Sequence, residues 1–195
     1  MLDSCKGFFK VLTKGKSFIN LNYLVTFVYM NLIIQSTLKT LQKSQVLLDH
    51  LSNSQLSDAS VSPYYSSIGC HVRHILDFYD CIFNISEDNK VDLTARSRNK
   101  EVECDCGCAQ DYLNQIIGQL SSSKFDIDET VLVTDDLGLG QTEIPYTYGS
   151  LLAQANSHTI HHYAIINYIF DSLGIVINDD EFGYNPTTPK QVSSE

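Results

Sequence analysis

Apolar residues recur every three or four positions in four stretches of the chain, which is the spacing of one face of an α-helix. These stretches predict helices over residues 23–51, 65–85, 108–120 and 147–173. Gly174 follows the last stretch, at the position where a glycine commonly ends a helix. Four helices joined by mostly short links favour a helical bundle.

Two links lack the helical period. Residues 84–102, NISEDNKVDLTARSRNKEV, are mostly polar and predict a surface loop. The other link, residues 124–146, contains the β-favouring run Thr130 to Thr134 and then an Asp-Asp-Leu-Gly turn signal. The sequence therefore predicts an all-α fold, a four-helix bundle with a small extended or β-hairpin excursion before the last helix.

The length of 195 residues indicates a single domain with short additions at its ends. We expect a bundle domain over residues 23–190, an N-terminal extension over 1–22 and a tail over 191–195. Residues 1–50 hold six lysines and two acidic residues, although the whole chain has a formal net charge of −10. The extension is thus either disordered or a targeting segment. We expect the protein in the cytoplasm, or in mitochondria if the extension is a targeting segment.

The net charge and the length of the longest apolar run argue against nucleic acid and membrane partners. An acidic protein repels phosphate backbones, so we expect no nucleic acid partner. The most apolar run, residues 23–34, is shorter than the about 20 residues that a membrane-spanning helix needs, so no membrane partner is expected. The apolar first helix is compatible with a homodimer. Six cysteines without a good secretory signal predict free thiols in a reducing compartment.

Five of the six histidines fall in two of the predicted helices. His158 and His162 are four residues apart, so their side chains lie one turn apart on one face and can share a metal ion. The second helix offers His71 and His74, and either supplies a third ligand if the two helices face each other. His161 points about 100° away from His162 and is expected at the rim or surface. The alternative is a structural module with core histidines.

A cysteine-rich segment is the second candidate for a metal site, beside the histidines. Cys104, Cys106 and Cys108 alternate with acidic residues and glycine, and they lack the Cys-x-x-Cys pair that is typical of zinc sites. We therefore favour the histidines, and the sequence assigns no role to the three cysteines.

Three segments together resemble one known family, the DinB-like (YfiT-like) metalloenzyme superfamily. They are SSIGCHVRHILDFYD, SHTIHHYAIINYIF and GIVINDDEFGYNPTT, and the similarity covers about residues 30–190. The resemblance implies an up-down-down-up bundle and a divalent ion, often zinc or nickel, held by three histidines. Matched by position, these ligands are His74, His158 and His162. Phe78 departs from the pattern, since many relatives of this subgroup have a histidine there.

The resemblance implies a metal-dependent enzyme acting on a small molecule, either a thiol S-transferase using a low-molecular-weight thiol or a hydrolase. A bundle that binds metal or a ligand without turnover is the alternative. We take His71 and Asp77 as candidate catalytic residues. His71 lies on roughly the same face as His74, as a fourth ligand or a general base. Asp77, one turn beyond His74, either accepts an N–H from a ligand imidazole or is a solvated helix charge. Arg73 either binds a substrate carboxylate or forms a surface salt bridge.

Overall fold

The computed structural model describes the backbone of residues 21–189 and the side chains from residue 32 onward. The roles expected for the N-terminal extension and for the tail 191–195 lie outside the described side chains. Within the described part of the chain, no helix is both long and apolar enough to cross a membrane.

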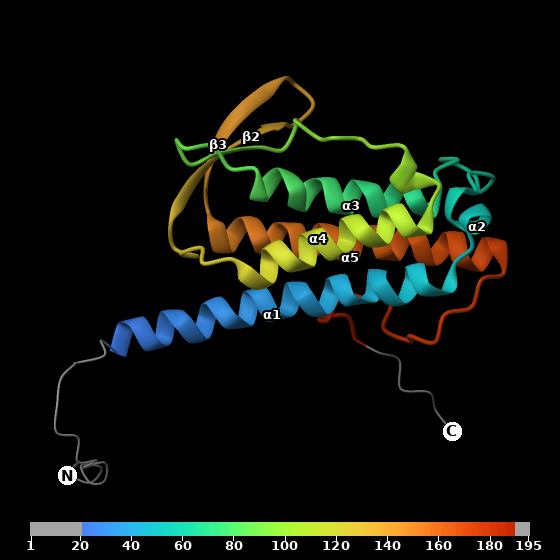
Figure 1. Cartoon of the computed structure of the whole chain (residues 1–195), viewed down its shortest axis with the longest axis horizontal. Helices are drawn as coiled ribbons and strands as arrows, with labels where there is room; N and C mark the ends of the chain where they lie inside the picture. The colour runs from blue at the N-terminus through green and yellow to red at the C-terminus, as the bar shows by residue number, and fades with distance from the viewer. Residues whose placement is uncertain (1–20, 190–195) are drawn as a thin grey trace, which may run out of the picture.

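Four long helices form the main body of the molecule (Figure 1). They are α1 (Leu21–His50), α3 (Ile68–Phe83), α4 (Cys106–Ser122) and α5 (Tyr148–Leu173). Two short helices lie in the links, α2 (Asn53–Ser57) and the 3-10 helix η1 (Glu101–Glu103). Helix α1 packs on α4 and α5, and α3 packs on the same two helices. In Figure 1, α1 and α5 run from left to right, while α3 and α4 run from right to left.

A three-stranded mixed sheet lies at one end of these helices, so the expectation of an all-α four-helix bundle is wrong (Figure 1). Its strands are β1 (Lys90–Asp92), β2 (Thr130–Asp136) and β3 (Gln141–Thr147). Strand β1 pairs in parallel with β2, and β2 pairs antiparallel with β3. The excursion expected before the last helix supplies only two of the three strands.

Strand β1 lies in the stretch that was predicted as a surface loop. Its central residue Val91 is 0% exposed, and Leu93 just beyond it is 1% exposed. Val91 lies opposite Val133 of β2. The strand escaped prediction because three residues are too few to show a period of two among polar neighbours.

Local signals define the ends of the two helices that carry the histidines. Ser67 caps the start of α3, where its hydroxyl accepts the N–H of Cys70 at 3.0 Å. Thr147 caps the start of α5 in a reciprocal arrangement with Ser150. Gly174 adopts a left-handed conformation with φ of 66° at the end of α5, which confirms the predicted helix end.

Buried hydroxyl groups tie α5 to its two neighbours. The Tyr163 hydroxyl donates to the backbone oxygen of Thr40 on α1 at 2.9 Å and lies 2.6 Å from the hydroxyl of Ser44. On the side of α3, the hydroxyl of Tyr79 lies 3.2 Å from that of Thr159. Because buried hydroxyl groups need partners, these contacts oppose rotation of α5 and keep His158 and His162 turned toward α3.

A glycine near the start of α3 allows η1 to pack directly on that helix. A Cβ atom added at Gly69 would clash with the backbone oxygen of Glu103. We expect Gly69→Ala to lower the free energy of unfolding by about 2 kcal/mol or more, because the backbone of η1 must move. Urea unfolding followed by circular dichroism measures this. Gly118→Ala on α4 is the control, since nothing lies within 4 Å of the added carbon. Equal midpoints for the two variants would contradict the expected close approach.

Candidate metal centre

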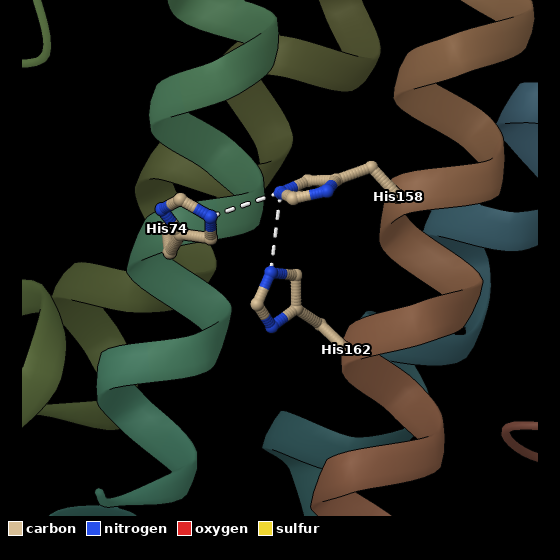
Figure 2. Close-up of side chains that lie close together, drawn as sticks. All are labelled: His74, His158 and His162. Carbon is tan, nitrogen blue, oxygen red and sulfur yellow. Dashed lines mark hydrogen bonds between the residues drawn. The ribbon is translucent and has the colours of Figure 1, made fainter. Parts of the chain in front are cut away.

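Three histidine side chains from two helices point toward one another (Figure 2). His74 comes from the middle of α3, and His158 and His162 come from consecutive turns of α5. One ring nitrogen from each lies within 4.8 Å of the others. The Nε2 atom of His158 is 2.9 Å from Nε2 of His74 and 3.1 Å from Nε2 of His162. The structure therefore brings together the three residues that were predicted as metal ligands.

The spacing of these nitrogens suits a divalent ion. Bonds of about 2.0–2.1 Å to a tetrahedral zinc ion place the ligand nitrogens roughly 3.3 Å apart. The observed separations of 2.9 and 3.1 Å are close to that value, and the nitrogens of the third pair, His74 and His162, lie within 4.8 Å of each other. Three protein ligands also leave a fourth position open, which is the pattern of catalytic rather than structural zinc sites.

Burial keeps the three imidazoles neutral. Burial, helped by the positive charge of Arg96, lowers the pKa of His74 to about 4. Burial, with His158 as the next largest cause, lowers the pKa of His162 to about 2. Burial and the neighbouring His161 also lower the pKa of His158. At neutral pH all three rings therefore offer a lone pair, as metal binding requires.

His71 lies behind His162 rather than in the three-histidine group. Its Nδ1 atom is 2.9 Å from Nδ1 of His162, and its Nε2 atom is 2.9 Å from the hydroxyl of Ser66. If His162 coordinates through Nε2, its proton lies on Nδ1 and is donated to His71, which in turn donates from Nε2 to Ser66. His71 is thus placed to orient the ring of His162, and its role as a general base stays a prediction.

Asp77 is fully buried, with 0% exposure. Its carboxylate accepts hydrogen bonds from the side chains of Arg73 (2.6 Å), Ser97 (3.1 Å) and Tyr112 (3.2 Å), and from the backbone N–H of Arg98 (3.2 Å). Among the described residues, no hydrogen bond joins Asp77 to His74. Asp77 is therefore neither an acceptor for a ligand imidazole nor a solvated charge.

Arg73 is occupied by the same network. Besides its bond to Asp77, its Nε atom donates to Glu103 at 2.6 Å. The whole residue is buried. Arg73 therefore forms an internal salt bridge rather than a surface one, and both of its charged contacts are to protein carboxylates.

Several other side chains surround the centre. The Phe78 ring packs on His158, with ring centroids 5.0 Å apart. His161 is exposed, as expected. Arg96 lies in the link that was predicted as a surface loop, yet its Nη1 atom is 3.2 Å from Nδ1 of His74. No periodicity pointed to Arg96, because only the tertiary fold brings it to α3.

The cysteine-rich segment forms no comparable cluster in the described part of the chain. The thiol of Cys104 donates to the backbone oxygen of Lys100 at 3.4 Å, and that of Cys106 donates to the backbone oxygen of Leu51 at 3.4 Å. The residue between them, Asp105, caps the start of α4. These contacts indicate a structural role.

No family model, no curated protein and no solved structure matches the chain. The DinB-like relationship therefore stays a prediction that depends on the quoted motifs. The residues of the centre, their distances and their burial carry the functional interpretation.

Proposed function

We propose that the protein is a distant DinB-like protein that uses a divalent metal ion to act on a small molecule. The convergence of His74, His158 and His162 within 4.8 Å is the observation that supports this proposal. An ion held by three neutral imidazoles keeps its full charge and an open position, so it can lower the pKa of a bound water or thiol. Zinc and nickel are the proposed metals, because the resembling family often holds one of them and both accept imidazole ligands.

The residues around the centre have roles that fit this chemistry. His71 and Ser66 fix the ring of His162 through the two contacts described above. Phe78 is buried and packs on His158, which limits water on that side of the site. We propose transfer to or from a low-molecular-weight thiol, or hydrolysis, as the reaction class.

The cysteines support a reducing compartment. None of the five cysteines among the described residues forms a disulfide. Such thiols are typical of proteins in a reducing environment. We therefore propose a cytoplasmic location, or a mitochondrial one if the basic N-terminal segment acts as a targeting signal.

Adding metal to the metal-depleted protein should fill one site per chain. We expect zinc or nickel to bind with a stoichiometry of one by elemental analysis after gel filtration. The melting temperature should also rise, since a ligand at 100 times its Kd stabilises the folded state by about 2.7 kcal/mol. Magnesium is the control, because it prefers oxygen ligands and should leave the melting temperature unchanged. Absence of stoichiometric metal together with an unchanged melting temperature would contradict the proposal.

Turnover separates an enzyme from a metal-binding protein without activity. The zinc- and nickel-loaded protein can be screened with low-molecular-weight thiols plus electrophiles, and with hydrolysable esters and amides. We expect at least one reaction to proceed faster than with the His74→Ala variant. No excess rate over that variant across the panel would mean that the centre binds metal without turnover.

A further inference from the structure

Arg96 is held in a defined position beside the metal centre. Its Nη1 atom is 3.2 Å from Nδ1 of His74, and its Nε atom donates to the backbone oxygen of Leu93 at 3.0 Å. The two residues that follow it are both tied to Asp77, through the hydroxyl of Ser97 and the backbone N–H of Arg98. The side chain is half-buried, and the segment that carries it is fixed on both sides.

The positive charge of Arg96 has no carboxylate partner among the described residues, since none of their ion pairs includes it. Arg73, four residues from Asp77 on α3, instead contacts two carboxylates. A half-buried cation without a counter-ion is unusual in a protein with a formal net charge of −10. Arg96 therefore lies beside the centre without an ion-pair contact to any carboxylate among the described residues.

Metal binding is incompatible with the present contact between Arg96 and His74. A guanidinium group only donates hydrogen bonds, so Nδ1 of His74 accepts here and the ring proton lies on Nε2. Coordination of a metal uses the lone pair of Nε2, the atom that faces His158. The ring proton then lies on Nδ1, so this N–H faces the N–H of Arg96 and the hydrogen bond between the two residues is lost. The guanidinium must therefore turn to another acceptor when the metal is bound.

We infer that this acceptor is the carboxylate group of a small-molecule substrate at the open metal position. The inference rests on the proposed function and adds the substrate class to it. With Nε held by Leu93, Arg96 keeps its two terminal nitrogens, whose parallel N–H bonds match a planar carboxylate. A dianionic phosphate is less suitable, because it carries twice the negative charge of a carboxylate and the protein as a whole is acidic.

The test uses the full chain loaded with cobalt(II), which reports thiolate binding by its absorption spectrum. The two probes are 3-mercaptopropionate and 1-propanethiol, which differ only in the carboxylate. We expect the protein to prefer 3-mercaptopropionate by at least about tenfold, as a charge-assisted hydrogen bond predicts. Arg96→Met should remove this preference while retaining, or increasing, the affinity for cobalt(II). Arg96→Lys, which keeps the charge but loses the two parallel N–H donors, should give an intermediate preference.

Arg98→Met is the matched control, since it removes the same charge from an exposed residue two positions away. It should keep the full preference. Equal losses in the two variants, or an unchanged preference in Arg96→Met, would overturn the inference while leaving the metal site intact. Displacement of 3-mercaptopropionate by inorganic phosphate more readily than by acetate would overturn the assignment of a carboxylate. Failure of the unaltered protein to take up cobalt(II) would overturn the proposed function and this inference with it.

Discussion

Replacing His158 with alanine is expected to abolish stoichiometric binding of zinc or nickel. The Nε2 atom of His158 lies within 3.1 Å of the corresponding atoms of both other histidines, so it occupies the centre of the group. Loss of a partner that only orients a ligand already costs 10- to 100-fold in metal affinity, and loss of a ligand should cost more than about 100-fold. Elemental analysis after dialysis, together with the metal-dependent rise in melting temperature, measures the effect.

His161→Ala is the matched control for that experiment. His161 lies on the same helix, three residues from His158, but is exposed and outside the three-histidine group. The control variant should retain one metal ion per chain. His74→Ala and His162→Ala should behave like His158→Ala. A full complement of metal in any of these three variants would show that the ligands have been chosen wrongly.

Replacing Asp77 with alanine is expected to destabilise the fold by about 3 kcal/mol or more. Removal of one partner from a buried ion pair leaves an uncompensated charge, which typically costs 3–5 kcal/mol. Here Arg73 keeps its contact with Glu103, but the hydroxyls of Ser97 and Tyr112 lose their acceptor. Urea unfolding gives the free energy, and Asp77→Asn keeps the side-chain volume if the alanine variant does not fold.

Two comparisons separate this structural role from a role at the metal. Glu143→Gln removes one partner of the exposed pair with Lys90, whose side chains are 50% and 48% exposed, and should cost less than about 1 kcal/mol. Folded Asp77→Asn should still bind one metal ion with an affinity close to that of the unaltered protein. A 10- to 100-fold loss of metal affinity at unchanged stability would instead identify Asp77 as a partner of a ligand histidine.

The long helices were determined by the sequence alone. Their apolar residues recur with the helical period, and caps such as Thr147 and Gly174 mark their ends by local chemistry. The sheet was only partly predictable. The run from Thr130 to Thr134 favours a strand by composition, whereas β1 is too short to show a pattern and forms because β2 offers it a pairing edge.

The candidate centre, too, could be predicted from the sequence only in part. The spacing of His158 and His162 fixes their common face, because residues four apart on a helix always lie one turn apart. Spacing could not choose between His71 and His74, which lie three apart on one helix. The family resemblance selected His74, and the packing of α3 on α5 places it against His158 while His71 contacts the far side of His162.

Only the tertiary structure decided what surrounds the histidines. Asp77 accepts hydrogen bonds from residues 20 to 35 positions away, and Arg96 reaches His74 across 22 positions. Such contacts depend on how α4 and the link between α3 and α4 pack against α3, and a polar link has no periodicity from which its path can be predicted. The ligand pair on α5 is therefore a property of the sequence, whereas the neighbouring charges that govern its chemistry are a property of the fold.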